Sequence, residues 1–520
     1  MKHFKKFFSY LVALTMVLSL AAFTGVKVHA EGTTYTLTLS DTSTGHTYEA
    51  YQVFTGDLNK EKNSEGKEVK VLSNVKWGTG INSSKEADLI NALKSDDTLK
   101  DKFGNVTDAA SVAKALEDVA SNSAEMDAFA QVIGKYLSTP SQSSSGNEIK
   151  GLAAGYYLVK DKDGSQKDKP DAYTKFIVNV VGDTTAAIKS GVPTVEKKVQ
   201  DTNDSTGETS NWQDSADADI GDDVQYQITG TMPDNIADYT TYKYTFTDTM
   251  SKGLTYNSDA KITIGNTDVT GSFTPTVKTN DDKSTTVTWA CDDLKGISGV
   301  TLDKDTKVVV AYSANLNKDA VIGSAGNPNE VNLTYSNNPN KGGEGETGTT
   351  PKDKNIVFTY KTVVNKFDQD GKTRLKGAGF TLKKKVKNAA DKVVKTFTAG
   401  EETTFEFTGL DDGDYELSET TTPAGYNTIT PIKFTISAEH DTESDEPKLT
   451  DLSGNVSSGE ATFTANTSAG SLTTDVVNKK GSTLPSTGGM GTTLLYVAGG
   501  ILVACAAAYV VMSRKHSTNK

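Results

Sequence analysis

Cysteine is nearly absent from this chain of 520 residues, which contains only two, Cys291 and Cys505. Cys505 lies within an uncharged apolar run near the C-terminus, so Cys291 stands alone in the remainder of the chain. Many secreted proteins gain durability from disulfides. An intramolecular disulfide is excluded here, and any covalent reinforcement of the fold must come from other chemistry.

Histidine is also scarce. Of the five histidines, only His46 and His440 lie outside the terminal segments, and they are far apart in sequence. A serine or cysteine hydrolase normally needs a general base beside its nucleophile, and a zinc site needs grouped His or Cys ligands. We therefore expect no enzymatic turnover, no bound metal and no cofactor.

Positive charge is outweighed by negative charge: the net charge is −13 and the isoelectric point is near 5.1. This balance argues against nucleic acid and anionic membranes as partners. Hydrophobic residues make up only 35% of the chain, yet Tyr and Thr recur in alternating runs. That alternation is typical of β-strands rather than of disorder.

Both ends of the chain contain segments that are set apart from the fold. Residues 1–30 combine Lys2, Lys5 and Lys6 with an apolar stretch and a small-residue cleavage site after Ala30, which predicts a signal peptide. Near the other end, LPSTGG at 484–489 precedes an uncharged apolar run at 494–512, long enough to cross a bilayer, and then a basic tail. The mature chain is expected to begin outside the cell, near residue 31.

The region between these ends is long enough for three domains. The N-terminal domain, 31–188, has alternating strands and two helical stretches, at 83–96 and 108–137, and is predicted to be a β-sandwich with helical insertions. The middle domain, 189–350, and the third, 351–481, contain short strands separated by turns. The predicted fold class is mostly β, with tandem immunoglobulin-like sandwiches.

Two acidic segments were weighed as calcium sites. The loop at 201–223 lacks the ordered ligand spacing of a calcium loop and is interpreted as solvated. The DQDG at 368–371 has no Glu at the closing position, so a hairpin turn is the better interpretation.

Polar residues stand in phase with apolar neighbours in several predicted strands, where residues two apart face the same side. In the middle domain these are Lys197, Asp248 and Asn329; in the third domain they are Lys366, Glu419 and Asn478. A single such lysine could be a surface charge or a stem reaching to solvent. A buried ammonium is costly unless it is paired or neutralised, and two Lys–acid–Asn sets in consecutive domains indicate a shared chemical purpose.

The order of signal peptide, ectodomain, LPSTG, apolar span and basic tail resembles that of Gram-positive surface proteins processed by sortase. The resemblance makes 482–520 a sorting signal of the LPXTG type, recognised through Leu484 and Pro485, with cleavage between Thr487 and Gly488. The acyl group on Thr487 would then pass to an amine, either of peptidoglycan or of a lysine on another copy.

The segment YELSETTTPAGY at 415–426 resembles the E-box of Gram-positive pilins, Y-x-L-x-E-T-x-A-P-x-G-Y. Thr422 replaces the family's Ala, a change that we did not expect to matter. The third domain thus resembles a Cna-B-type domain, and the middle one resembles the isopeptide-forming domain of major (backbone) pilins. The resemblance implies that Lys197 joins Asn329 and Lys366 joins Asn478, with Asp248 and Glu419 assisting a single self-reaction.

The acceptor of Thr487 in such a polymer would be Lys189, eight residues before Lys197, a spacing similar to that of the family's pilin-motif lysine. The fuller motif, a Trp with V-x-V-Y-P-K, is absent, and Lys175 is the second choice. The implied partners are sortase, other copies of the chain, accessory pilins, peptidoglycan and host surface ligands, at the cell wall of a Gram-positive bacterium.

Tension between Lys189 and Thr487 would bypass the N-terminal domain, whose opening strand has no lysine, so no internal bond is expected there. The alternative is a monomeric wall-anchored adhesin that binds host matrix.

Overall fold

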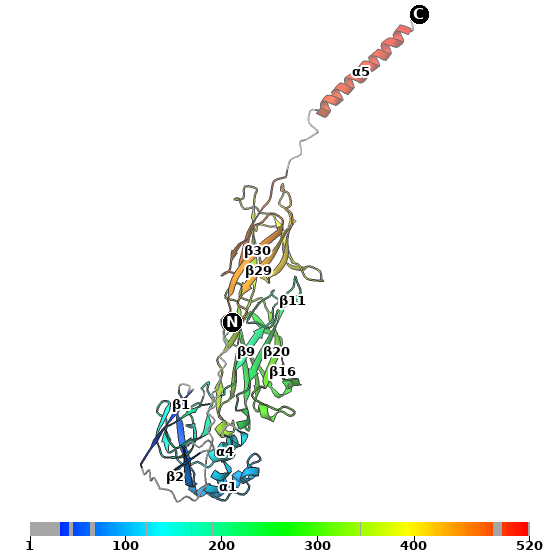
Figure 1. The fold of residues 1–520 in the computed structure, drawn as a ribbon. Helices are drawn as coiled ribbons and strands as arrows, with labels where there is room; N and C mark the ends of the chain where they lie inside the picture. The colour runs from blue at the N-terminus through cyan, green and yellow to red at the C-terminus, as the bar shows by residue number, and fades with distance from the viewer. Residues whose placement is uncertain are drawn as a thin grey trace.

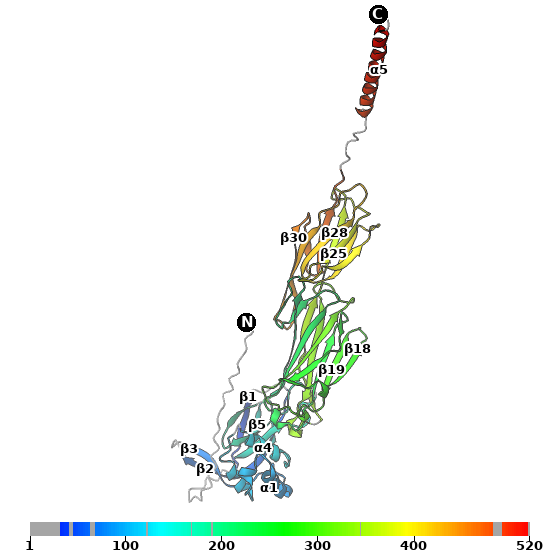
Figure 2. The ribbon, with the colours of Figure 1, turned by 90° about the vertical axis from the view of Figure 1, so that its right-hand side faces the viewer.

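The computed structural model describes residues 32–40, 45–62, 68–120, 123–167, 169–188, 191–343, 345–481 and 491–517. The predicted signal peptide, Lys189 and the LPSTGG segment lie outside the described residues. The molecule is elongated, with an N-terminal domain at one end, two β-sandwiches stacked along its length and a helix beyond them (Figures 1 and 2). The predicted fold class, mostly β with helices near the N-terminus, is confirmed.

The N-terminal domain contains two sheets and a group of helices. One sheet has the order β5 (Glu148–Leu152), β1 (Tyr35–Ser40), β8 (Thr184–Ala187). The other has the order β3 (Glu68–Trp77), β2 (Tyr48–Lys62), β6 (Gly155–Asp161), β7 (Lys175–Val180), and β4 (Gln142–Ser143) also pairs with β2. The helices are η1 (Ser83–Lys85), α1 (Glu86–Ser95), α2 (Lys100–Phe103), α3 (Ala109–Ala115) and α4 (Ala124–Gly134).

The second predicted helical stretch forms two helices, α3 and α4, rather than one. Asp108 caps the start of α3 through a reciprocal pair of hydrogen bonds with Ser111. Ser123 caps the start of α4, its Oγ accepting from the backbone N–H of Met126 at 3.2 Å. Each serine or aspartate satisfies backbone donors that a new helix leaves unpaired, so Ser123 starts a new helix within the stretch.

The middle domain is a sandwich of two sheets. The first has the order β17 (Thr267–Asp268), β16 (Lys261–Ile264), β20 (Lys307–Leu316), β13 (Asp223–Thr231), β9 (Val195–Val199), with β15 (Leu254–Tyr256) on β20. The second has the order β12 (Ser215–Asp217), β23 (Asp353–Phe358), β21 (Asn327–Ser336), β14 (Tyr244–Met250), β19 (Thr285–Cys291), β18 (Thr274–Thr279), with β22 (Thr347–Thr349) on β21. A small hairpin joins β10 (Thr202–Asn203) and β11 (Glu208–Thr209), and the short helices are η2 (Ile236–Asp238), η3 (Thr270–Ser272), η4 (Leu294–Gly296) and η5 (Pro339–Lys341).

The third domain is a second sandwich. Its sheets have the orders β27 (Thr404–Leu410), β24 (Tyr360–Phe367), β32 (Ser471–Val477), β31 (Thr464–Asn466) and β26 (Lys392–Phe397), β25 (Gly379–Lys384), β28 (Gly413–Thr421), β29 (Ile432–His440), β30 (Leu449–Ser458). The first and last long strands of the domain, β24 and β32, lie side by side and run parallel. A bond between their ends would therefore link two adjacent strands.

The border between the two sandwiches does not coincide with the expected one at residue 350. Strand β23 pairs with β21 and β12 in the second sheet of the middle domain, and only Thr359 separates it from β24 of the third domain. Thr359 is fully buried, and its Oγ1 donates to the carbonyl of Leu410 at 3.1 Å. The chain thus passes from one sheet to the next as a nearly continuous extended segment.

The acidic loop was predicted to be solvated, and the structure corrects this interpretation. Asp214, Asp217 and Asp219 are each no more than 4% exposed. Strand β12, within the loop, pairs in parallel with β23, and Ser444 of the third domain donates its backbone N–H to Asp214 Oδ2 at 2.8 Å. Composition made the whole segment resemble a surface loop, but 214–219 are buried where the third domain covers them, while much of 202–212 is exposed.

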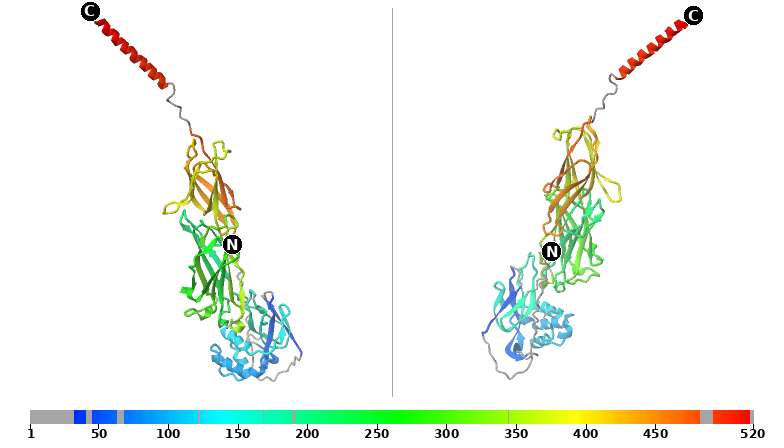
Figure 3. Two further views of the ribbon diagram at one scale, coloured as in Figure 1. Left: turned by 180° about the vertical axis from the view of Figure 1, so that it is seen from behind. Right: turned by 45° about the horizontal axis from the view of Figure 1, so that its top comes forward.

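The C-terminal helix, α5 (Gly491–Ser517), stands apart from the folded domains (Figure 3). Within the part of the chain that the structure describes, it is the one helix long and apolar enough to cross a membrane, with a mean hydropathy of 2.2 over Leu495–Arg514. The side chains of 495–514 are almost all exposed in the isolated chain, which suits a lipid-facing span.

Candidate functional site

The predicted Lys–acid–Asn set of the middle domain is brought together in the space between its two sheets. Lys197 lies on β9 at the edge of one sheet, and Asp248 and Asn329 lie on the neighbouring strands β14 and β21 of the other. All three side chains are 0% exposed. Alternation along β9 turns Lys197 inward with Val199, while Lys198 faces the other way.

Tyr312, on β20, joins the three side chains through its hydroxyl. Lys197 Nζ donates to Tyr312 Oη at 2.6 Å, and Asn329 Nδ2 donates to the same oxygen at 2.8 Å. Tyr312 Oη donates to Asp248 Oδ2 at 3.0 Å, and Lys197 Nζ also donates to that oxygen. The tyrosine hydroxyl is thus hydrogen-bonded to the amine, the acid and the carboxamide at once.

Burial controls the charge of the amine and the acid. Desolvation lowers the pKa of Lys197, an effect that the nearby Asp248 only partly offsets. Desolvation likewise raises the pKa of Asp248 against the opposing influence of Lys197. Although the Lys197–Asp248 contact has the geometry of an ion pair, both shifts favour a neutral amine beside a neutral acid, because an ion pair with no access to water must recover the hydration of both charges.

Two oxygens in this site have no hydrogen-bond partner: Asp248 Oδ1 and Asn329 Oδ1. They lie on adjacent antiparallel strands, two residues apart in register, where side chains on one face are within reach of each other. A buried acceptor without a donor is costly. A proton on Asp248 would supply a donor for the carboxamide oxygen.

A second carboxamide, Asn355 on β23, also borders Lys197. It is fully buried, its Nδ2 donates to the backbone carbonyl of Lys197 at 2.9 Å, and its Oδ1 is unpartnered. Its amide group is thus directed at the main chain of Lys197, whereas that of Asn329 shares Tyr312 with the amine. We retain Asn329 as the partner of Lys197, and Asn355 is the competing carboxamide.

The set of the third domain is arranged across its own two sheets. Lys366 lies near the end of β24, Asn478 directly follows β32, and Glu419 lies on β28 of the facing sheet. Lys366 and Asn478 are 0% exposed and Glu419 is 7% exposed. Parallel pairing places Lys366 opposite Val476, two residues before Asn478.

Glu419 holds the carboxamide of Asn478 directly. Asn478 Nδ2 donates to both carboxylate oxygens of Glu419, at 2.9 and 3.0 Å, and Asn478 Oδ1 is unpartnered. Lys366 Nζ donates to the carbonyls of Phe367 and Val476, each at 3.1 Å, and in the described structure makes no hydrogen bond to Glu419 or Asn478. Burial lowers the pKa of Lys366 to about 8, although the negative charges of Glu419 and Asp368 oppose the shift.

Thr422, the departure from the E-box pattern, makes a contact that alanine cannot make. Its Oγ1 donates to Glu419 Oε2 at 3.3 Å, and the backbone N–H of Ile429 donates to the same oxygen at 3.2 Å. We did not expect this substitution to matter. The structure instead gives Thr422 a part in orienting the acid.

Of the two candidate acceptor lysines, the structure describes only Lys175. Lys189 lies outside the described residues, as do Leu484, Pro485, Thr487 and Gly488. Lys175, the first residue of β7, lies partly buried in the N-terminal domain and interacts electrostatically with Asp238 on η2 of the middle domain. Helix α4 also reaches this junction, where Gln131 Nε2 donates to the carbonyl of Asp238 at 3.2 Å.

Burial lowers the pKa of Lys175 to about 7, with Asp238 offsetting part of the shift. The unfolded chain therefore binds more protons than the folded one between about pH 7 and 10.5, so this lysine costs stability that is recovered as the pH rises through that window. We expect Lys175→Met to raise the melting temperature by several degrees at pH 7. At pH 9.5 the rise in melting temperature should be smaller. Calorimetry at both pH values checks this, with exposed Lys150→Met as the control. An equal gain at both pH values would contradict the prediction.

Among the described residues of the N-terminal domain, the fully buried polar side chains do not include a lysine. The expectation that this domain has no internal Lys–Asn bond stays a prediction.

Comparison with protein families places known domain types on parts of the two sandwich domains. Residues 220–339 match the family described as Gram-positive pilin backbone subunit 2, Cna-B-like domain. Residues 361–448 match the family described as SpaA, prealbumin-like fold domain.

Two similar proteins extend the comparison beyond single domains. The trypsin-resistant surface T6 protein of Streptococcus pyogenes serotype M6 is 25% identical over 404 residues, which cover 64% of this chain and 70% of that protein. The solved T6 backbone pilin of the same serotype, which has a modular three-domain structure, aligns with 89% of this chain and 100% of its own, with a TM-score of 0.50 and 17% identity. At that identity the structural likeness concerns the fold.

Proposed function

We propose that this chain, in which parts of the two sandwich domains match the Gram-positive pilin backbone and SpaA prealbumin-like family models, is the backbone subunit of a covalently polymerised pilus on the cell wall. One observation carries the proposal: in each of the two sandwiches a lysine, an acid and an asparagine are enclosed between the sheets. Because these side chains are buried, they cannot act as surface charges. A covalent bond between the lysine and the asparagine would suit a domain that must withstand tension.

In the middle domain the reaction joins Lys197 to Asn329. The neutral Nζ attacks Cγ of Asn329, the new C–N bond forms, and the Cγ–Nδ2 bond breaks. Protonated Asp248 donates to the carboxamide oxygen as negative charge develops there and moves one proton from Nζ to the departing nitrogen. Ammonia leaves, so the reaction balances: an amine and a carboxamide give a secondary amide and ammonia. Tyr312 positions all three groups, and positioning alone supplies effective molarities of roughly 10⁵–10⁸ M.

In the third domain the same chemistry joins Lys366 to Asn478. Glu419 already holds the carboxamide, so the step that remains is a side-chain rotation that brings Nζ from the carbonyl of Val476 to Cγ of Asn478. Because burial lowers the pKa of Lys366 to about 8, a much larger share of this amine is neutral at neutral to mildly alkaline pH than for an exposed lysine. Neither domain turns over: each reacts once, so the chain is not an enzyme.

Assembly uses the two ends of the load-bearing region. Sortase would cleave between Thr487 and Gly488 and transfer the Thr487 acyl group to Lys189 of another copy, while α5 holds the precursor in the membrane. The last subunit would pass to peptidoglycan, and accessory pilins would supply contacts with host surfaces. The internal bonds lie in the two domains through which the tension between Lys189 and Thr487 passes.

The test is an electrophoretic analysis of wall extracts from the strain that expresses the chain. We expect a ladder of high-mass species that resists boiling in detergent, and its complete loss in Thr487→Ala. Ser486→Ala is the matched control, because it alters the variable position of the LPXTG motif and should keep the ladder. A single monomer-sized band in the parent strain would favour the monomeric adhesin and contradict the proposal.

A further inference from the structure

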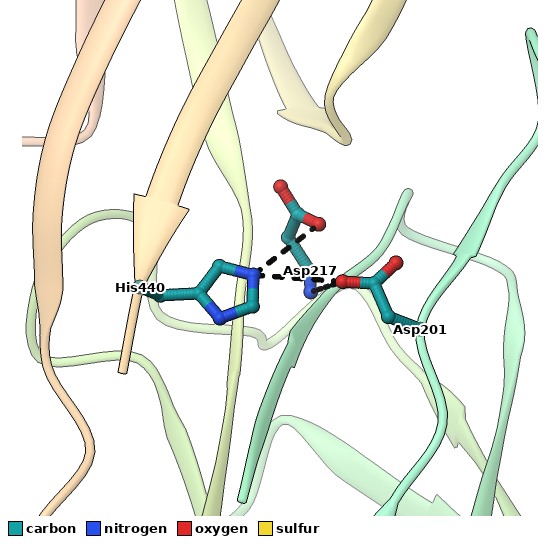
Figure 4. Close-up of side chains that lie close together, drawn as sticks. All are labelled: Asp201, Asp217 and His440. Carbon is teal, nitrogen blue, oxygen red and sulfur yellow. Dashed lines mark hydrogen bonds and ion pairs between the residues drawn. The ribbon is translucent and has the colours of Figure 1, made fainter. Parts of the chain in front are cut away.

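A histidine and several aspartates meet where the middle and third domains touch. Asp201 and Asp217 come from the acidic segment of the middle domain, and His440 is the last residue of β29 in the third (Figure 4). His440 Nε2 lies 3.5 Å from Asp201 Oδ2 and 3.9 Å from Asp217 Oδ1. One oxygen each of Asp217, Asp411 and Asp412 also lies within 4.8 Å of the others. We call these five residues the junction cluster.

The hydrogen bonds of His440 fix which of its nitrogens carries a proton. Nδ1 is 2.7 Å from Ser215 Oγ, and that hydroxyl donates its single proton to the carbonyl of Asp441. Ser215 Oγ must therefore accept from Nδ1–H. Nε2 is then directed toward two carboxylates, so that a bound cation, in competition with a proton on Nε2, would lie between them. Metal-binding histidines commonly have their second N–H held in this way.

Negative charge in the junction cluster exceeds the positive charge near it. Lys384 Nζ lies 2.8 Å from Asp411 Oδ2 and 3.4 Å from Asp219 Oδ2, so it neutralises one edge of the cluster. Lys392 pairs with Asp219 and Asp222, outside the cluster. Among the described residues, no lysine lies in salt-bridge contact with Asp201, Asp217 or Asp412.

Two buried polar atoms beside the cluster have no partner. Asp217 is 4% exposed and Tyr360 is 0% exposed, yet Asp217 Oδ2 and Tyr360 Oη make no hydrogen bond. The hydroxyl of Tyr360 faces the carboxylate of Asp217, its nearest partner in the cluster, without the geometry of a regular hydrogen bond. Unpaired buried groups are rare and call for an explanation. A bound ion provides one for Asp217 directly, and for Tyr360 through a water on the ion.

We propose that the junction cluster binds one divalent cation of the zinc class, with His440 Nε2 and carboxylate oxygens of Asp217, Asp201 and Asp412 as ligands. Imidazole with carboxylates suits Zn²⁺, whereas Ca²⁺ selects oxygen ligands alone. With metal–ligand bonds of about 2.0–2.2 Å, ligand atoms of a tetrahedral site are ~3.4 Å apart. The observed spacings of 3.5 and 3.9 Å contract to this value by small side-chain movements.

The consequence is a cross-link between domains that is reversible, unlike the internal bonds. Ligands from 201–217 of the middle domain and from Asp412 and His440 of the third would be fixed to one ion, which locks the junction at that side. Sequence patterns do not reveal this site, because the acidic loop lacks ordered ligand spacing and His440 lies more than 200 residues away from it.

The experiment uses the full chain in mild detergent, stripped with EDTA, dialysed and titrated calorimetrically with ZnCl₂, MnCl₂ or CaCl₂. We expect one Zn²⁺ per chain, bound more tightly than Ca²⁺, and a rise in the melting temperature of the metal-loaded chain. His440→Ala and the isosteric Asp217→Asn should each weaken Zn²⁺ at least tenfold. His46→Ala is the matched control, because His46 Nδ1 already bonds Asp161 at 2.9 Å and Asp171 lies at 3.4 Å from its Nε2.

A second measurement uses the unmodified chain, so it does not depend on whether the variants fold. Co²⁺ bound to the unmodified chain should give the visible absorption of a tetrahedral nitrogen–oxygen site, and Zn²⁺ should displace it. The proposal is overturned if the unmodified chain binds no Zn²⁺, if Ca²⁺ binds more tightly than Zn²⁺, or if Zn²⁺ affinity is unchanged in His440→Ala.

Discussion

Lys197→Ala is expected to add one ammonia mass to the intact chain, beyond the mass change of the substitution, and to make the middle domain melt at a clearly lower temperature. The unmodified chain should be two ammonia masses lighter than its sequence, and Lys366→Ala should likewise restore one. By analogy with a disulfide, a lost internal cross-link costs about 2–5 kcal/mol, which corresponds to roughly 5–20 °C for a domain of this size. Mass spectrometry, calorimetry and trypsin digestion measure the three effects.

Two neighbours serve as controls for this result. Lys198→Ala removes the next lysine of β9, which faces away from the site and contacts Asp214, and should leave the mass deficit at two ammonia masses. Asn355→Ala should do the same, whereas Asn329→Ala should restore one. If Asn355→Ala restores an ammonia mass and Asn329→Ala does not, then the assignment of the bond in the middle domain is wrong.

Lys189→Ala is expected to abolish the ladder of polymers in wall extracts, leaving only the monomer attached to peptidoglycan. The effect is all or none because alanine offers no amine to the Thr487 acyl group. The internal bonds should form as before, so the purified monomer should still lack two ammonia masses. Electrophoresis of the extracts, with tandem mass spectrometry of cross-linked peptides, measures both.

Lys175→Met is the matched variant, since it removes the second-choice amine while keeping a long apolar side chain. It should keep the full ladder. A ladder that survives Lys189→Ala and disappears in Lys175→Met would move the acceptor to the junction of β7 with η2, where the lowered pKa of Lys175 makes it a neutral nucleophile near pH 7.

The inward-facing residues were predictable because strand periodicity is a local property. Lys197, Asp248 and Asn329 each stand in phase with apolar neighbours, and burial of one face of a strand then forces them between the sheets. What the sequence could not supply was the neighbour on another strand. Tyr312 occupies an inward position of an ordinary apolar strand, where a tyrosine is far more often a core residue than a bridge between an amine and an acid.

The junction between the sandwiches was beyond local reasoning for a different reason. The segment around Asp217 has the composition of a solvated loop, and only its pairing with β23 and its cover by His440 and Asp411 make it an interior. The end of the middle domain was misplaced similarly, because β23 follows a linker-like stretch rich in Gly and Thr. Contacts of such high sequence separation leave no periodic signal in the chain.

The parallel pairing of β24 and β32 has a consequence for extensibility. Once Lys366 is joined to Asn478 as proposed, a pull that enters at the start of β24 and leaves after β32 would cross from Lys366 to Asn478, so the roughly 110 residues between them would never receive it. Unravelled, that segment would add several hundred Å to each subunit. A pilus fibre of the proposed kind would keep its contour length until a covalent bond breaks, and the number of subunits, rather than the drag of the surrounding flow, would set the distance between a bacterium and its point of attachment.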